Sequence, residues 1–272
     1  VVLSVLSFVV FSIFSFAYTP SLYAPKTDDY IVQLDADSFY FLENVPTPQK
    51  AKPISEAKFT SEPIDENSYG WPGHERTITQ ELEDEEGKNM YDFYVNKVDL
   101  TQDDMYYHPK APEQTWSTWD AVNSLQRAKV KVTLDPIHLR IRTSNLYMPP
   151  GELITFEIPP SAVNRVTVYV DFHRQAENIK DRLKYLACRT LLTQPKSTWG
   201  YPTGGAITFE VTDASANVAI EVNVTGCVIA PHFTYGVTDE KEWEETIKNI
   251  QAPTAQITNG VINQFMPATT IR

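Results

Sequence analysis

The sequence predicts a mainly β protein: an antiparallel β-sandwich with a few short helices and an extended N-terminal region. Two observations support this fold class. From residue 129 onward, six runs are rich in Val, Ile, Thr and aromatic residues, and most of them alternate apolar with polar side chains. Proline outnumbers glycine by 19 to 10, which favours loops and strand borders over long helices. The runs cover residues 129–134, 137–142, 152–158, 165–172, 204–211 and 218–230.

The first seventeen residues carry no charge and end in Ser15-Phe16-Ala17, a small-x-small pattern that suits signal peptidase. We therefore expect a signal peptide at residues 1–17, and a secreted or cell-surface protein with no membrane insertion after cleavage. A retained N-terminal anchor is the alternative, although the run is shorter than the roughly 20 apolar residues of a membrane span. No Met or basic residue precedes the run, so we expect the sequence to be clipped at this end.

Residues 18–111 are predicted to be an extended, acidic N-terminal region. Proline recurs in its first part and periodicity is weak, with one strand candidate at residues 31–45. The acidic run at residues 81–86 lacks the spacing of a calcium-binding loop, which indicates a solvated surface. The net charge of −12 also excludes nucleic acid as a partner, because phosphate binding needs a basic face.

The β-sandwich lobe is predicted to cover residues 112–258. It should begin with a short helix within residues 115–128, capped by Ser117, and end with a helix capped by Thr238. Between the strands, residues 174–187 are either a helical segment or a long loop.

The sequence contains no complete catalytic set. His74-Glu75 resembles the start of the zinc motif H-E-x-x-H, but the position of the second His is occupied by Ile78. The serine-hydrolase elbow, a phosphate-binding glycine loop and a C-x-x-C pair are also absent from the sequence. We expect this chain alone to be inactive.

Three residues are candidates for covalent modification in an oxidising compartment. Cys188 and Cys227 either form one disulfide or remain two buried thiols. Asn223 begins the sequon Asn-Val-Thr and is a candidate for N-glycosylation, although it lies within a strongly strand-like run.

Several ordered motifs resemble the enhancin-type, mucin-degrading zinc metallopeptidases. The stretch NLYMPPGELITFEIP (residues 145–159) is similar to the phrase that opens the family's domain. YPTGGAITFEV (residues 201–211) is similar to a later glycine-containing strand. Residues 224–257 give the closest match: they contain APHFTYG and Trp243, where the family has its Glu-x-Trp pair, and here Lys241 stands at the position of that Glu. The sequence departs from the family pattern at His232, where the family has Tyr, and at Thr254, where it has Trp.

The resemblance implies that residues 140–258 are the non-catalytic sandwich lobe of a secreted or surface zinc metallopeptidase acting on mucin-like glycoproteins. Residues 259–272 would then begin a truncated catalytic lobe. The family's zinc motif follows this region, so zinc is expected in the full-length parent and no zinc ligand is assigned to this chain. The alternative is a secreted glycan- or protein-binding sandwich module without peptidase activity.

If the sandwich binds a glycan or glycoprotein, exposed aromatic residues near turns should form the binding surface. The candidates are Trp199, Tyr201, His232 and Tyr235. The competing interpretation is that these side chains pack in the core or in loops.

Overall fold

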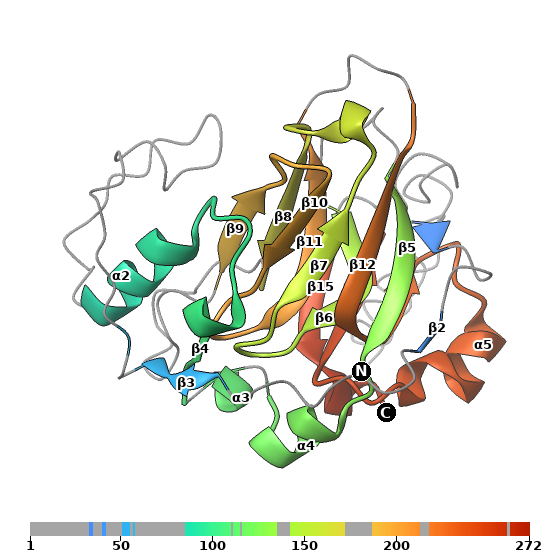
Figure 1. Ribbon diagram of the computed structural model, residues 1–272. Helices are drawn as coiled ribbons and strands as arrows, with labels where there is room; N and C mark the ends of the chain where they lie inside the picture. Colours follow the sequence, from blue (N-terminus) through green and yellow to red (C-terminus); the bar gives the residue numbers. More distant parts are fainter. Residues whose placement is uncertain are drawn as a thin grey trace, which may run out of the picture.

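The computed structural model describes residues 33–34, 40–41, 51–54, 57, 85–109, 111–114, 116–134, 142–171, 187–212, 218–259 and 262–272. The fold is mainly β and its large sheet is antiparallel, which confirms the predicted fold class. Four short helices lie at the periphery of the large sheet: α2, α3, α4 and α5 (Figure 1). Among the described residues, no helix has the length and apolar character needed to cross a membrane.

The strands form two layers that share one long strand. The first layer contains β5 (Ala128–Leu134), the N-terminal part of β12 (Ile220–Ile229), β7 (Ile154–Glu157) and β10 (Lys196–Trp199). β1 (Gln33–Leu34) and β2 (Tyr40–Phe41) pair with the other edge of β5. The second layer contains β6 (Arg142–Met148), β11 (Gly205–Val211), β8 (Val166–Val170) and β9 (Cys188–Leu191).

β12 passes from one layer to the other at a bulge. Asn223, Val224 and Thr225 pair with both β5 and β7. The register shifts between Thr225 and Cys227, and Gly226 adopts a φ of 96°, which glycine tolerates better than other residues. Beyond the bulge, Val228 and Ile229 pair with β6.

The core lies between the two layers. Alternating residues of β5 and β7 are buried, as expected for strands with one face against a core. Phe156 of the first layer meets Phe209 of the second edge-on, with ring centroids 6.4 Å apart. Burial of these apolar faces is the main force that holds the layers together.

The described part of the N-terminal region contributes to this core, which its sequence did not indicate. Within the described part, α2 (Glu85–Tyr94) is followed by residues whose side chains are buried with the sandwich. The turn η5 (Gln102–Asp104) leads into β4 (Tyr106–Tyr107), which pairs in parallel with β3 (Lys52–Pro53). The buried core residues from this region are Ile54, Met90, Tyr94, Val95, Leu100 and Met105.

Residues 96–100 form a strap across two sheet edges. The amide of Asn96 donates to the carbonyl of Arg189 on β9 (3.0 Å), and the amide of Leu100 donates to the carbonyl of Thr198 on β10 (3.1 Å). The Thr198 hydroxyl returns a bond to the Leu100 carbonyl (2.7 Å). The strap therefore occupies edge groups that could otherwise pair with another chain.

A small second sheet follows the sandwich. It consists of β13 (His232–Thr234), β14 (Thr254–Thr258) and β15 (Asn263–Pro267), with β13 parallel to β14 and β15 antiparallel to it. β14 also lies against β6 and β11 of the large sheet. α5 (Glu240–Glu245) and the turns η7 (Ile247–Asn249) and η8 (Ala268–Thr270) complete this region.

Two predicted helices are present, but each is capped one residue later than expected. α4 (Trp119–Ser124) follows the four-residue α3 (Ala111–Gln114) and is capped by Thr118, whose side chain accepts from the Ala121 amide, rather than by Ser117. α5 is capped by Asp239 rather than by Thr238. In both cases a side-chain oxygen one residue closer satisfies an amide of the first turn.

Candidate functional site

The structure does not bring the four predicted glycan-binding residues together on the surface. Trp199 and Tyr201 are fully buried. The Trp199 indole Nε1 donates to the Tyr94 carbonyl (3.0 Å), and the Tyr201 ring packs edge-on against the Tyr94 ring at 5.7 Å. Their prediction as a sugar-binding surface is wrong, because α2, whose packing the sequence did not indicate, covers them.

His232 and Tyr235 lie in and just after β13. The His232 imidazole is part-buried, with Nε2 at 2.9 Å from the Thr143 hydroxyl on β6. Burial lowers its pKa from 6.5 to about 4, so the ring is neutral near pH 7. Tyr235 is 41% exposed in the turn that follows β13, and is the one candidate of the four that presents a large exposed surface.

Of the two expected states, the structure shows Cys188 and Cys227 as free, buried thiols rather than as a disulfide. Cys188 is on β9 and Cys227 is on β12, and three strands of the large sheet separate them. A disulfide requires Cα atoms within about 7 Å, little more than one strand spacing. Burial raises the pKa of Cys227 to about 12 and also raises the pKa of Cys188, which makes both thiols unreactive.

Asn223 lies in the middle of β12, between β5 and β7. Its neighbours Val222 and Val224 face the core, so Asn223 belongs to the opposite face of the sheet and is half-buried there. Its glycosylation stays a prediction.

The described residues do not fit a zinc site. Within those ranges, no group of three or more His, Cys, Asp or Glu side chains is placed to hold a metal ion. His232 already bonds Thr143, and the two cysteines lie on separated strands. His74, His138 and His173 lie outside the described residues.

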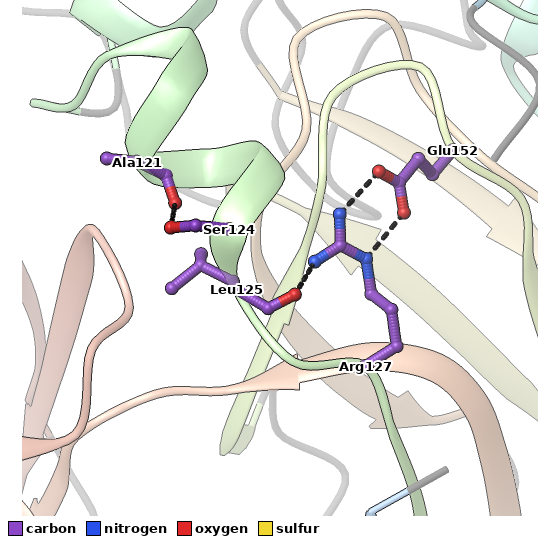
Figure 2. A network of polar contacts seen from close by, with 5 residues as sticks. All are labelled: Ala121, Ser124, Leu125, Arg127 and Glu152. Atoms are coloured by element: carbon purple, nitrogen blue, oxygen red, sulfur yellow. Dashed lines mark hydrogen bonds and ion pairs between the residues drawn. The ribbon is translucent and has the colours of Figure 1, made fainter. Parts of the chain in front are cut away.

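The turn that opens the resembling stretch is fixed by a buried ion pair. Arg127, just before β5, binds Glu152 through two bonds: Nε to Oε2 at 2.7 Å and Nη2 to Oε1 at 2.5 Å (Figure 2). Its remaining nitrogen, Nη1, donates to the carbonyl of Leu125 at the end of α4. The side chains of Arg127 and Glu152 are only 6% and 14% exposed. One guanidinium therefore joins α4, β5 and the turn between β6 and β7.

Glycines make the close contacts at this turn. Gly151 has a φ of 71°, and a Cβ there would lie 2.9 Å from the Tyr106 carbonyl. Gly204 has a φ of 61°, and a Cβ there would lie 2.4 Å from the Met148 carbonyl. The sequence signal for this region was the pair of motifs PPGE and TGG, which the structure brings side by side: the Gly151 and Gly204 amides both donate to the Tyr201 carbonyl (3.1 Å each).

Comparison with curated proteins finds distant relatives of much greater length. TRPM8 channel-associated factor 3 of Rattus norvegicus is 24% identical over 154 residues, which cover 52% of this chain and 17% of that protein. The Mus musculus protein of the same name is 25% identical over the same length. The chain thus spans about a sixth of the length of the curated relatives it matches.

Two solved structures with partial similarity are those of metallopeptidases. The IMPa metallopeptidase from Pseudomonas aeruginosa is 16% identical, with a TM-score of 0.42, over 50% of this chain and 17% of that one. The ZmpB metallopeptidase from Clostridium perfringens is 17% identical, with a TM-score of 0.39, over 51% of this chain and 34% of that one.

Two family models match adjacent parts of the chain. The model of the N-terminal domain of M60-like peptidases matches residues 123–225, which contain most of the sandwich. The model of peptidase M60, enhancin and enhancin-like, matches residues 226–272, which contain the end of β12 and the small sheet. The chain therefore belongs, through residues 123–272, to the enhancin-like M60 peptidase family.

Proposed function

We propose that this chain is the non-catalytic β-sandwich part of a secreted or cell-surface zinc metallopeptidase that acts on mucin-like glycoproteins. The observation that carries the proposal is where the two family models meet. Their boundary, between Thr225 and Gly226, falls inside β12.

A boundary inside a strand favours a structural role in a peptidase over a detachable binding module. The residues before the bulge pair with β5 and β7, whereas Val228 and Ile229 after it pair with β6. β14 adds a second contact, because the Gln256 amide nitrogen donates to the Leu146 carbonyl on β6 (3.2 Å). The segment that matches the peptidase model is thus built into the sandwich from its first residue, and the two should fold as one unit.

The chemistry is proposed for the longer protein. Zinc would activate a water there and a glutamate would act as the base, as in zinc metallopeptidases generally. Mucin-like glycoproteins as substrates follow from the resemblance to the enhancin-type enzymes. This chain would supply the folded support for that site.

The test compares this 272-residue chain with the product of its complete gene. We expect the complete product to cleave an O-glycosylated mucin and to lose that activity with a chelator, and we expect this chain to be inactive under both conditions. Chelator-sensitive cleavage by this chain would show that the site lies within it. An inactive complete product, together with saturable binding of this chain on a glycan array, would instead identify a glycan-binding module.

A further inference from the structure

The interface between the small sheet and the large sheet contains several buried polar side chains. Thr143 of β6, Thr208 of β11 and Gln256 of β14 are each 3% exposed or less, and all three belong to strands that meet at this interface. Thr143 and Thr208 are directly paired across β6 and β11, and His232 and Gln256 are directly paired across β13 and β14. The Thr143–His232 bond joins the two pairs.

Three buried oxygen atoms of this interface have no hydrogen-bond partner: Asn145 Oδ1, Thr208 Oγ1 and Gln256 Oε1. Asn145 stands between Thr143, which bonds His232, and Tyr147, which packs with Ala252 just before β14. The Gln256 side chain is oriented by its bond to the Leu146 carbonyl, which leaves Oε1 as the free end. Three unpartnered oxygens in one interface are a costly arrangement, because buried polar atoms normally have a partner.

The chemistry of these three atoms identifies what would satisfy them. The two amide oxygens can only accept hydrogen bonds, whereas the threonine hydroxyl can donate one. An anion would be repelled by the amide oxygens. A divalent cation usually needs carboxylate ligands as well as neutral oxygens, and no group of three or more His, Cys, Asp or Glu in the described part of the chain is placed to hold one. A neutral molecule that donates twice and accepts once satisfies all three, and water is the smallest that does so.

We propose that a single buried water molecule binds between the two sheets, donating to Asn145 Oδ1 and Gln256 Oε1 and accepting from the Thr208 hydroxyl. The water joins β6, β11 and β14. It therefore connects the part of the chain that matches the N-terminal family model with the part that matches the peptidase model. The proposal does not depend on the proposed function.

The test measures long-lived internal water in the full chain by magnetic relaxation dispersion. Thr208→Val keeps the shape of the side chain and removes the donor, so we expect it to abolish the contribution of one long-lived water. Thr190→Val is the matched control, because Thr190 is equally buried and its hydroxyl donates directly to the Lys97 carbonyl at 2.5 Å. We expect the control to leave the water signal unchanged.

A crystal structure of the unsubstituted chain provides the second measurement. Density for a water within hydrogen-bond distance of all three oxygens would support the proposal. An interface in which Thr208 donates directly to Gln256 or Asn145 would overturn it, and so would a water signal that Thr208→Val does not alter.

Discussion

Replacing a single buried polar side chain should have a large effect on the stability of this chain, and Glu152 is the clearest case. Glu152→Gln leaves the Arg127 guanidinium buried with a neutral partner, since Arg127 is held at two of its nitrogens by this carboxylate. Breaking one side of a buried ion pair costs about 3–5 kcal/mol. We expect a loss of unfolding free energy of this order in chemical denaturation.

The matched control is the exposed pair Lys196–Glu157, whose side chains are 68% and 38% exposed. Glu157→Gln should cost less than about 1 kcal/mol, because solvent screens surface ion pairs. Equal costs for the two substitutions would mean that Arg127 is not buried as described.

His232 should make stability depend on pH. Its pKa is lowered from 6.5 to about 4 in the folded chain, so the unfolded chain binds more protons between these values. The stabilisation is complete above about pH 6.5 and is lost as the pH falls towards 4. We expect the stability difference between the wild type and His232→Gln to shrink from pH 7 to about pH 4.5. A difference that stays constant or grows on acidification would contradict the part-buried, neutral imidazole.

At the scale of one element, two neighbouring hydroxyls, those of Ser117 and Thr118, are candidates for the N-cap of α4. The Thr118 side chain accepts from the Ala121 amide at 3.3 Å, whereas the Ser117 hydroxyl contacts only the Thr118 carbonyl at 3.5 Å. Thr118→Ala should therefore destabilise the chain by about 1 kcal/mol, and Ser117→Ala should have little effect. Thermal unfolding of the two variants measures this, and the reverse order would assign the cap to Ser117.

Strands with a clear apolar pattern could be predicted from the sequence, and strands without one could not. The runs at 129–134, 152–158, 165–172, 204–211 and 218–230 correspond to β5, β7, β8, β11 and β12. β6 was missed over most of its length, since the polar residues Thr143, Ser144 and Asn145 interrupt the apolar pattern. Distant segments supply their partners: Thr143 bonds His232 of β13, and Ser144 donates to the Ile207 carbonyl of β11. Two predicted segments lie almost entirely outside the described residues. Only Arg142 of the run at 137–142, and only Ala187 of the segment at 174–187, are described.

The candidate site was harder to predict because it depends on contacts between distant segments. Trp199 and Tyr201 lie near turns, as expected, but α2 covers them from about a hundred residues earlier in the chain. By contrast, Glu152 and Gly151 belong to a motif that the sequence did indicate, and they lie where β6, β7 and β11 meet. The local sequence therefore indicated the turn at Gly151 and Glu152. Nothing in the sequence around Trp199 and Tyr201 indicated that α2 would bury them.

At the scale of the whole molecule, the sandwich and the N-terminal region should fold together. Met90, Tyr94, Val95, Leu100 and Met105 are buried in the same core as the strands. Removing residues 1–111 would delete these side chains and expose Trp199 and Tyr201, which are fully buried in the complete chain. Burial of each such side chain contributes about 1.5–3 kcal/mol, and typical domains are stable by only about 5–15 kcal/mol.

We therefore expect a shortened chain that begins at residue 112, where the sequence predicted the sandwich to start, to lose its fixed tertiary structure. A chain that begins at residue 85 is the control, because it keeps α2 and the strap of residues 96–100. Near-ultraviolet circular dichroism and cooperative thermal unfolding distinguish the two outcomes. The exposed edges of β9 and β10 should also make the shorter chain self-associate, since the strap no longer occupies them. Sharp, cooperative unfolding of the chain from residue 112 would show that the strands alone form the stable unit.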